Sequence, residues 1–367
     1  MKIVLVILHA DPLRGGAERY TVDLAGALER RGHDVFLADA GDTGAEYSII
    51  DSKDIPYHQV KLKGGGVTRV GQYHRFIKSL NQFIDDHHFD IVHAMLPVPR
   101  CDVYHPHAGI AIQSVLKTGM RLPFNMRRKA FANVERELLT GSNAPVVLCL
   151  SDYVKQEVSD HYPMIPQNKL QTLFNAVDLH RFEPESRRKL STEIRALMIA
   201  NDFDRKGLAE TLHAMAKVRD PRLHLDVYGK EDTRKYAQLA AELKISDLVR
   251  FRGITSNPRE AYLQADFFIL PTRHDPCSLV VLEALSMGLP VISTRFNGAC
   301  EIMTDGVHGF VLPDPNDVDA LAQATKRMLE PPLRARMSAA CLELRPRLSY
   351  EHHLDQLIQI YQQSVIK

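Results

Sequence analysis

The sequence lacks the features that mark several classes of protein. Its five cysteines are scattered and form no Cys-x-x-Cys pair, which favours a reduced, cytoplasmic protein over a disulfide-bonded secreted one. The net charge of +1 gives no electrostatic reason to expect a nucleic-acid partner. No apolar run approaches the ~20 residues of a membrane-spanning helix. The opening apolar run at residues 1–8 is too short for most signal peptides.

Apolar runs that alternate with helical stretches indicate an α/β protein. The 367 residues, of which 45% are hydrophobic, suit two domains. Strands are expected at Ile3–Leu8, Val35–Ala38, His58–Leu62, Ile91–Ala94, Val146–Leu150, Ala196–Ala200, Leu223–Tyr228, Val249–Phe251, Phe267–Leu270, Val291–Ser293 and Phe310–Leu312. This alternation predicts two Rossmann-like domains with parallel sheets. We expect a first domain at residues 1–172, a second at 173–348, and an amphipathic C-terminal helix at 349–367 that packs back on the body.

Two carboxylates eight positions apart, Asp275 and Glu283, form the most informative motif. A short apolar strand that ends at Pro271 precedes them, and a helical pattern begins at Ser278. Ligands of open α/β sheets bind beyond the carboxyl ends of strands, so this junction is a candidate site. Glu283 has apolar neighbours one turn away, including Leu279. A carboxylate buried there requires a partner from the protein or from a ligand.

A second candidate loop follows the first strand of the second domain. Arg205 and Lys206 precede a helix whose dipole disfavours cations, so an anion such as a diphosphate is expected between them. The alternative is a solvated basic turn that pairs with Asp202 and Asp204. The Asp-x-Asp pattern of these two residues also matches a divalent-metal motif of some transferases, although the adjacent cations would repel a metal.

The first domain contributes three further loops. Gly15 and Gly16 precede a helix, which suits binding of a phosphate or sugar but also suits a plain tight turn. His107 lies in a small-residue turn that would face the ligand cleft; the alternative is a structural histidine. Lys63–Gly66 is either a loop that closes over a substrate or a mobile surface turn. Three residues suggest part of a zinc site without an evident fourth ligand: Cys101, His105 and His107.

The stretch Lys117–Arg136 mixes cations with apolar residues and contains a single acid, Glu135. Its cations are Lys117, Arg121, Arg127, Arg128, Lys129 and Arg136. The large apolar residues in it and directly before it are Leu116, Met120, Leu122, Phe124, Met126 and Phe131. This mixture fits a surface that meets an anionic membrane or a polyanionic acceptor. An ordinary solvated helix face is the alternative.

Together these residues resemble the retaining family 4 glycosyltransferases of the GT-B fold. The stretch Asp275–Ala284 is similar to the family's Glu-x-Phe-Gly-x-x-x-x-Glu motif followed by Ala, with Asp275 in place of the first Glu and Ser278 in place of a frequent Gly. Other similar segments are Gly15–Gly16, Asn175–Asp178, Arg205–Gly207, Gly288–Ile292 and Gly298–Ile302. Within the family, the lipopolysaccharide core glucosyltransferase I group is most similar, on Gly15–Gly16, Asp102–Tyr104 and Asp202–Gly207.

The resemblance implies two Rossmann-like domains that face a central cleft. It implies transfer of a hexose from a nucleotide-diphosphate sugar, with UDP-glucose or another UDP-sugar as the expected donor. The acceptor would be a glycan or glycolipid of lipopolysaccharide core or cell-surface polysaccharide synthesis. We expect neither metal nor cofactor, because the nucleotide-sugar is a substrate, and no nucleic-acid partner. The expected location is the cytoplasm, with contact at the inner face of the cytoplasmic membrane through residues 117–136.

The resemblance also implies a role for each candidate residue. Arg205 and Lys206 would stabilise the departing diphosphate, Glu283 would accept both ribose hydroxyls, and Asp275 would hold hydroxyls of the donor sugar. His107 would orient the sugar and stabilise an oxocarbenium-like state. The remaining donor contacts would come from Gly15, Gly16, Cys277, Ser278 and Leu279.

Other functions remain compatible with these residues. A nucleotide-sugar 2-epimerase uses the same fold and donor site but releases a free sugar without an acceptor. A non-catalytic module that binds a nucleotide-sugar or a glycan is the third possibility.

Overall fold

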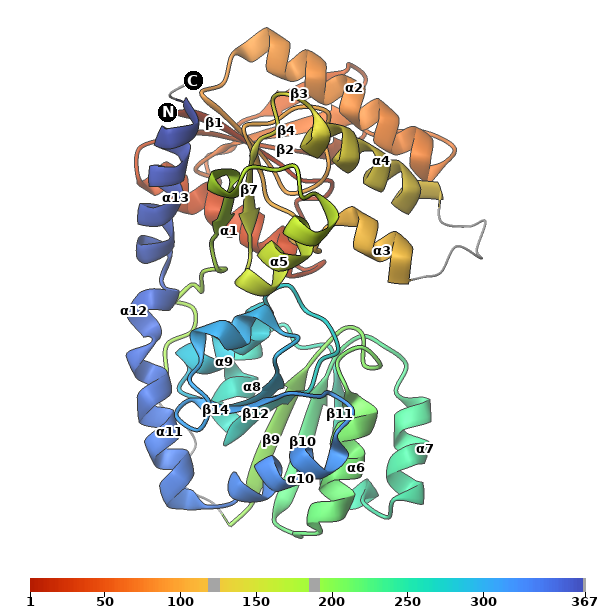
Figure 1. Ribbon diagram of the computed structural model, residues 1–367, viewed down its shortest axis with the longest axis vertical. Coiled ribbons are helices and arrows are strands. Elements are labelled where there is room, and N and C mark those ends of the chain that lie inside the picture. Colours follow the sequence, from red (N-terminus) through yellow and green to blue (C-terminus); the bar gives the residue numbers. More distant parts are fainter. Residues whose placement is uncertain (118–125, 185–191, 366–367) are drawn as a thin grey trace. The chain divides into compact units, whose positions relative to one another are not determined.

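The computed structural model describes residues 1–117, 126–184 and 192–365. The chain divides into two compact units (Figure 1). Unit 1 comprises Met1–Phe174 together with His353–Lys367, and unit 2 comprises Asn175–His352. The chain therefore enters unit 2 once and returns to unit 1 near its C-terminal end. Each unit is built around its own sheet.

Unit 1 contains an eight-stranded sheet in the order β3-β4-β2-β1-β5-β6-β7-β8. Neighbouring strands are parallel except for β3 and β4, which are antiparallel. The strands are β1 Lys2–Val6, β2 Asp34–Gly41, β3 Tyr47–Ile50, β4 His58–Lys63, β5 Ile91–Ala94, β6 Val103–Tyr104, β7 Val146–Cys149 and β8 Leu170–Thr172. The helices are α1 Gly16–Arg30, α2 Arg69–His87, α3 Ala111–Lys117, α4 Met126–Thr140, α5 Asp152–His161 and the 3-10 turn η1 Gln167–Lys169.

Unit 2 contains a six-stranded, fully parallel sheet in the order β11-β10-β9-β12-β13-β14. The strands are β9 Ile194–Ile199, β10 Leu223–Tyr228, β11 Val249–Gly253, β12 Phe267–Leu270, β13 Val291–Thr294 and β14 Gly309–Leu312. The helices are α6 Leu208–Val218, α7 Arg234–Glu242, α8 Pro258–Gln264, α9 Leu279–Ser286, α10 Val318–Arg327, α11 Pro331–Glu343 and α12 Arg345–Leu348, with 3-10 turns η2 Ser246–Leu248 and η3 Gly298–Ile302. The last helix, α13 Tyr350–Val365, runs from unit 2 into unit 1.

The predicted α/β fold is confirmed, and every strand expected from the sequence is present. Strands β5 and β12 are buried along their whole length, which explains why they are unbroken apolar runs. The edge strand β3 was not expected because its residues are half-buried or exposed and lack an apolar alternation. Strand β8 was missed because its three residues give too short a pattern.

Strand order places two loops of unit 2 next to each other. Strand β9 begins the first half of the sheet and β12 begins the second half, and the two strands are neighbours. The connections that follow β9 and β12 therefore both start at the carboxyl ends of the strands, and one leads towards β10 while the other leads towards β13 on the opposite side. Such a switch point is where open α/β sheets bind ligands. In unit 1, the neighbours β1 and β5 form the corresponding switch point.

Buried polar rings join α13 to the sheet of unit 1. The Tyr361 hydroxyl hydrogen-bonds to Nδ1 of His93 at 2.6 Å, and Nε2 of His93 lies 3.2 Å from Nδ1 of His105. The Tyr20 hydroxyl on α1 hydrogen-bonds to Nε2 of His353 at 2.7 Å. All five side chains are buried. These bonds compensate most of the polar atoms for burial, although Nε2 of His105 has no hydrogen-bond partner among the described residues, and they position the C-terminal helix on unit 1.

This cluster predicts a loss of stability in mild acid. Burial, with repulsion from neighbouring histidines, holds the pKa values of His93 and His105 well below 6.5 and lowers that of His107 to about 3. The unfolded chain binds these protons near pH 6.5, so the histidines stabilise the fold above that pH and the contribution is lost as pH falls below it. Each histidine that titrates adds a slope of about 1.4 kcal/mol per pH unit.

We therefore expect the free energy of unfolding of unit 1, measured by urea denaturation, to decrease from pH 7.5 to pH 5. His107→Asn removes one such proton and should make the decrease shallower. The matched change at the exposed His74 on α2 should leave the slope unaltered. A stability that does not depend on pH in this range would contradict the burial argument.

Candidate functional site

The loop that follows β9 is anchored by an aromatic side chain. Phe203 is fully buried, its ring contacts that of Tyr236 edge to face at 5.5 Å, and its backbone N–H donates to Glu231. Lys206 and Gly207 complete the turn into α6 through backbone bonds to residues 202 and 204. The anchor explains how a loop with several charged residues adopts one conformation.

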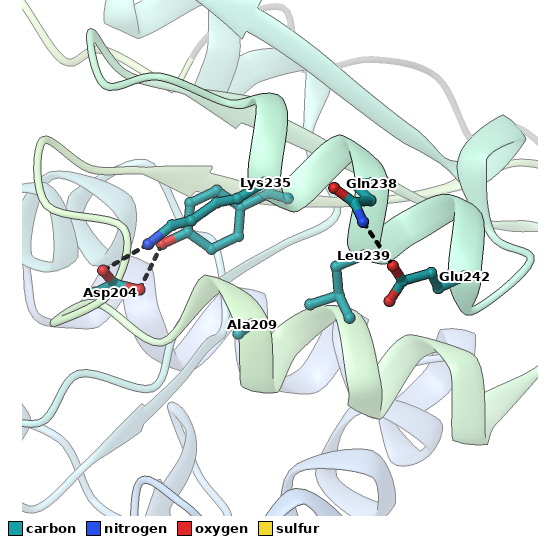
Figure 2. Close-up of a pocket in the computed structure, with 7 residues that line it drawn as sticks. Asp204, Ala209, Lys235, Gln238, Leu239 and Glu242 are labelled. Atoms are coloured by element: carbon teal, nitrogen blue, oxygen red, sulfur yellow. Dashed lines mark hydrogen bonds and ion pairs between the residues drawn. The ribbon is translucent and has the colours of Figure 1, made fainter.

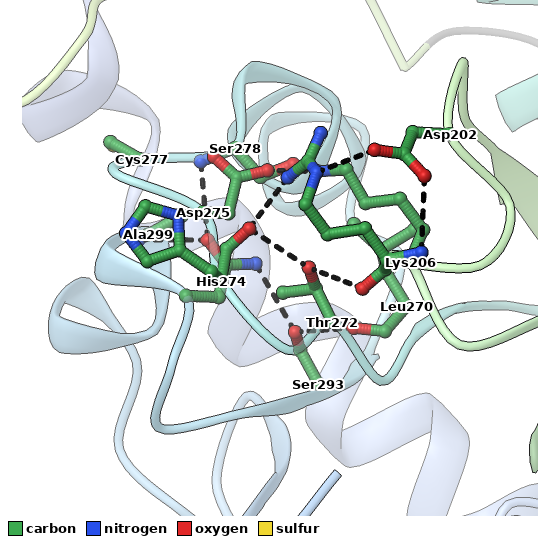
Figure 3. A network of polar contacts seen from close by, with 12 residues as sticks. Asp202, Lys206, Leu270, Thr272, His274, Asp275, Cys277, Ser278, Ser293 and Ala299 are labelled. Carbon is green, nitrogen blue, oxygen red and sulfur yellow. Dashed lines mark hydrogen bonds and ion pairs between the residues drawn. The ribbon is translucent and has the colours of Figure 1, made fainter. Parts of the chain in front are cut away.

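The Lys206 ammonium forms a buried ion pair with the Asp275 carboxylate (Figure 3). The two residues are 7% and 9% exposed. Burial lowers the pKa of Lys206, whereas the Asp275 carboxylate opposes that shift. Residues 69 positions apart in the sequence thus meet because their loops leave neighbouring strands at the switch point. Removing either partner would leave a buried charge uncompensated.

Arg205 is held by the same pair of loops. Its Nε lies 2.9 Å from Asp202, and its Nη1 donates to the carbonyl of His274 at 2.5 Å. Arg205 and Lys206 therefore do not need a bound anion to balance their charge, contrary to expectation, because the protein supplies a carboxylate to each. Their role toward a diphosphate stays a prediction.

Gly207 permits the close approach of the two loops. Its φ of +78° lies in the left-handed region, and a Cβ atom there would lie 2.4 Å from the Pro271 carbonyl oxygen. Behind this contact, the Arg273 N–H donates to the Arg205 carbonyl at 2.9 Å. A side chain at position 207 would therefore force apart the loops that carry Lys206 and Asp275.

Asn297 organises the loop that carries the carboxylate motif. It is fully buried, and its Oδ1 accepts from the backbone N–H groups of Ser278 and Ala299 at 3.1 and 3.2 Å. Backbone bonds join Asp275 to Phe296 and Gly298 on either side of it. The sequence analysis missed Asn297, and its only local signal is its place before the Gly298–Ile302 segment.

The donors expected at the start of α9 differ in availability. The Ser278 N–H already bonds to Asn297, so this amide is not open to a phosphate as expected. The Leu279 N–H lies in the first helical turn, which lacks intrahelical acceptors. Cys277 is buried, its carbonyl accepts from the Asn175 side chain at 3.2 Å, and burial raises the pKa of its thiol. The thiol is therefore neutral.

Glu283 has a protein partner. The Tyr262 hydroxyl on α8 donates to Glu283 Oε2 at 2.7 Å, and the carboxylate residue is 5% exposed. A ribose is therefore not required to explain this carboxylate on an apolar helix. A carboxylate has about four acceptor positions, so the hydroxyl of Tyr262 leaves the proposed ribose contact chemically possible.

The two carboxylates of the Asp-x-Asp pattern point to different partners. Asp202 binds Arg205, whereas Asp204 binds Lys235 and Tyr236 at 2.6 and 2.9 Å (Figure 2). Asp204 also lines a pocket of about 340 Å³ beside α6 and α7. Among the described residues, no group of three or more His, Cys, Asp or Glu is arranged to hold a metal ion.

In unit 1, the loop after β1 leads directly into α1. Gly15 is the N-cap residue, and Arg14 lies 3.8 Å from the Glu18 carboxylate within the first turn. Gly16 is exposed at the helix N-terminus. The backbone N–H groups of this turn have no acceptor within the helix, which suits an anion but does not establish one.

His107 follows β6 in a tight turn and packs among rings. Its ring centroid lies 4.3 Å from that of Tyr20 and 4.1 Å from that of His105. Its Nε2 has no hydrogen-bond partner among the described residues. Since its pKa is about 3, the ring is neutral at neutral pH. The neutral ring can donate or accept a hydrogen bond. It carries no negative charge, so it cannot stabilise a positively charged sugar by ion pairing.

The remaining loop, Lys63–Gly66, is tethered to α2. The Gln72 side chain donates to the Gly66 carbonyl at 2.9 Å, and the Arg75 side chain donates to the Gly65 carbonyl at 3.0 Å. Closure of this loop over a substrate would have to break these bonds.

Only part of the Lys117–Arg136 stretch can be described. Residues 118–125, with Met120, Arg121, Leu122 and Phe124, lie outside the described residues. Glu135 is fully buried and accepts from two tyrosine hydroxyls and two backbone amides. In the described part of the chain, no helix is long and apolar enough to cross a membrane. Membrane contact stays a prediction.

Known families cover most of the chain. Residues 14–181 match the family described as "Glycosyltransferase Family 4", and residues 181–342 match the family described as "Glycosyl transferases group 1". The lipopolysaccharide glucosyltransferase WaaG of Escherichia coli is 24% identical over 341 residues, which cover 87% of this chain and 88% of WaaG.

Solved structures show the same GT-B fold. The crystal structure of WaaG, a glycosyltransferase involved in lipopolysaccharide biosynthesis, has a TM-score of 0.78 at 21% identity and covers 94% of this chain and 95% of that one. The structure of Anabaena HepE in complex with UDP-glucose has a TM-score of 0.71 at 17% identity, with 99% and 98% covered. The solved structures confirm the expected fold, and the two family matches confirm the expected family.

The contact between Gly207 and Pro271 predicts a large effect of a single methyl group. Gly207→Ala should lower the free energy of unfolding of unit 2 by more than the ~1–2 kcal/mol that a left-handed backbone costs a non-glycine residue, because the added Cβ also meets the Pro271 carbonyl. Urea denaturation measures the difference.

Gly306 is the matched control. Its φ is +76°, and a Cβ there would meet no atom within 4 Å. Gly306→Ala should therefore show the backbone cost alone, and equal losses in the two variants would refute the close-approach argument.

Proposed function

The chain belongs to the glycosyltransferases of group 1 and family 4, and we propose that it transfers a hexose, with retention, from a nucleotide-diphosphate sugar to a glycan or glycolipid. The observation that carries this proposal is the Lys206–Asp275 pair at the switch point of unit 2. It combines a cation for a leaving phosphate with an acceptor for sugar hydroxyls. Binding of UDP-glucose by the structural neighbour HepE supports a UDP-sugar donor.

Breaking the sugar–phosphate bond places negative charge on the departing diphosphate. Arg205 and Lys206 would stabilise that charge, and the loop contacts hold both side chains before the donor binds. Asp275 lies against Lys206 and would hold hydroxyls of the sugar, which is joined to the diphosphate at its anomeric carbon. The pair would therefore serve adjoining parts of one donor. Leu279 and the glycines Gly15 and Gly16 would add backbone donors to phosphate.

Glu283 and His107 would bind groups on either side of the reacting bond. Glu283 would accept both ribose hydroxyls while keeping its bond to Tyr262. His107 would orient the donor sugar as a neutral ring through its buried Nε2, which has no hydrogen-bond partner among the described residues. Any stabilisation of an oxocarbenium-like state by His107 would then come from hydrogen bonding and the lone pair.

Front-face substitution is the proposed route to retention. Within the described ranges no second carboxylate stands out as a covalent nucleophile, since Asp275 is engaged by Lys206. The sugar–phosphate bond would break first, and the acceptor hydroxyl would attack the same face of a short-lived ion pair. The diphosphate would leave with the bonding electron pair and take the proton of the acceptor hydroxyl. A metal would not be required, because Arg205 and Lys206 neutralise the diphosphate.

The proposed acceptor is a membrane-held glycolipid of lipopolysaccharide core or cell-surface polysaccharide synthesis. The similarity to WaaG supports this assignment. We propose a cytoplasmic location at the inner face of the cytoplasmic membrane.

Incubation with a panel of nucleotide-sugars, with and without acceptor glycolipid, tests this function. Release of nucleotide diphosphate that depends on acceptor supports the transferase. Release without acceptor would favour the 2-epimerase, and saturable binding without turnover would favour a binding module. Each reaction is repeated with EDTA, and strict dependence on metal would refute the metal-free mechanism.

Replacing the Lys206 ammonium should slow the chemical step. We expect Lys206→Met to lower kcat by roughly 10²–10³, the scale for losing one charge-stabilising donor. Lys217→Met is the control, because Lys217 lies on α6 with its side chain half exposed and paired with Asp319. Thermal unfolding separates loss of chemistry from loss of fold. If Lys206→Met turns over at the wild-type rate, Lys206 does not stabilise the departing diphosphate.

Glu283→Gln should weaken UDP binding about tenfold or more, the scale of a hydrogen bond to a charged group. Tyr262→Phe removes the protein donor to the same carboxylate and leaves the charge, so it should retain UDP affinity. Titration calorimetry measures both variants. If Glu283→Gln binds UDP as tightly as wild type, the ribose role is refuted.

A further inference from the structure

A pocket of about 490 Å³ lies between the N-terminal ends of α2 and α4 in unit 1. Its lining combines three arginines with apolar and hydroxyl groups: Thr68, Arg69, Val70, Met126, Arg127, Arg128 and Phe131. The volume lies in the range that holds small molecules and head groups. None of these residues belongs to the candidate donor site.

The helices that carry the arginines are firmly placed. Phe131 on α4 packs against Tyr73 on α2 with ring centroids 4.3 Å apart, beside the core of unit 1. The Arg127 guanidinium lies over the Phe131 ring, 5.1 Å from its centroid. Thr68 caps α2 by accepting from the Gly71 N–H at 3.0 Å. The pocket is therefore built on rigid elements.

No carboxylate neutralises these arginines within the described residues. None of Arg69, Arg127 and Arg128 forms an ion pair there. Glu135, the only acid of its stretch, is turned inward and bound by Tyr104 and neighbouring groups. Partial burial of Arg127 and repulsion from Arg69 and Arg14 lower the pKa of its guanidinium. The arrangement therefore costs free energy that a bound anion would recover.

The arginines at the N-terminal ends of the two helices also indicate that the pocket binds an anion. Helix N-termini favour acidic residues, yet neither α2 nor α4 has an acid in its first turn, and both have arginines there. In unit 2, the cations Arg205 and Lys206 at the start of a helix are paired with aspartates. The pocket of unit 1 differs because its arginines have no carboxylate partner in the part of the chain that the structure describes.

The surroundings of the pocket are amphipathic. Three exposed apolar residues, Leu13, Val67 and Met126, directly precede Arg14, Thr68 and Arg127 in the sequence. Arg14 is close enough to Arg127 to affect its pKa, so the basic region extends to the loop after β1. Exposed apolar side chains beside arginines suit a ligand that is anionic and attached to lipid.

We propose that this pocket, formed by Arg69, Arg127 and Arg128, binds a phosphoryl group of the lipid-held acceptor. Arginine presents a fork of donors that matches phosphate oxygens, and the first N–H groups of α2 add to it. The identification of the acceptor as the source of the phosphoryl group rests on the proposed function; the anion-binding pocket itself does not.

Vesicle binding by the full-length protein tests the pocket without donor or turnover. Vesicles of phosphatidylcholine with phosphatidic acid supply the phosphoryl group, and pure phosphatidylcholine vesicles are the reference. We expect wild type to bind only the former, and Arg127→Gln and Arg69→Gln each to weaken that binding about fivefold, the effect of ~1 kcal/mol per arginine. Soluble glycerol 3-phosphate in excess should displace the protein.

Arg136→Gln is the matched control for Arg127→Gln. Arg136 lies on the same helix, is exposed and does not line the pocket, so the change in charge is identical. Its binding should stay within twofold of wild type. Arg127→Lys keeps the charge but loses the fork, and it should fall between wild type and Arg127→Gln.

Several results would overturn the pocket. The proposal fails if the protein binds both vesicle types equally. It also fails if Arg136→Gln loses as much binding as Arg127→Gln, or if glycerol 3-phosphate does not compete. Either of these last two results would mean that the protein is attracted to the charged surface as a whole. UDP affinity of the same variants should match wild type. Because that affinity reports the donor site, failure of the pocket and failure of the proposed function give different results.

Discussion

The approach of the loop after β9 to the loop after β12 is the contact on which the candidate site depends. Parallel neighbours at a switch point bring the two loops together, and Gly207 lets one backbone reach the Pro271 carbonyl. The Lys206–Asp275 pair forms across this contact, and Arg205 binds the carbonyl of His274 beside it. A buried pair of this kind contributes little net stability by itself, so its value lies in preorganising charge.

The two units differ in whether the cations of their candidate sites are paired with carboxylates. In unit 2, Arg205 and Lys206 are held by Asp202 and Asp275, which would avoid reorganisation if a diphosphate leaves there as proposed. In unit 1, buried polar groups such as Glu135 and His93 form hydrogen bonds inside the unit, whereas Arg69, Arg127 and Arg128 form no ion pair within the described residues. This contrast suits a preformed site for the proposed donor in one unit and an open site for an anion in the other.

Several features of the site followed from local sequence patterns, and others did not. The strands and the helix after Ser278 follow from short apolar runs and helix-start signals. Asp275 and Glu283 became candidates because they lie at that junction, and the resemblance to known enzymes includes the same residues. The partners of these residues were not predictable: Tyr262 is 21 positions from Glu283, and Asn297 is 19 positions from Ser278. Hydrogen bonds at such separations depend on how strands are ordered, which no local pattern records.

The sequence by itself determined the α/β fold, the family and the residues proposed to carry the chemistry, because apolar periodicity and short motifs are local properties. Only the tertiary structure decided how those residues are used. It paired Lys206 with Asp275, engaged the Ser278 amide, made His107 a neutral ring and turned Glu135 inward. Each of these depends on burial and on neighbours distant in the sequence, since desolvation and hydrogen bonding act through space rather than along the chain.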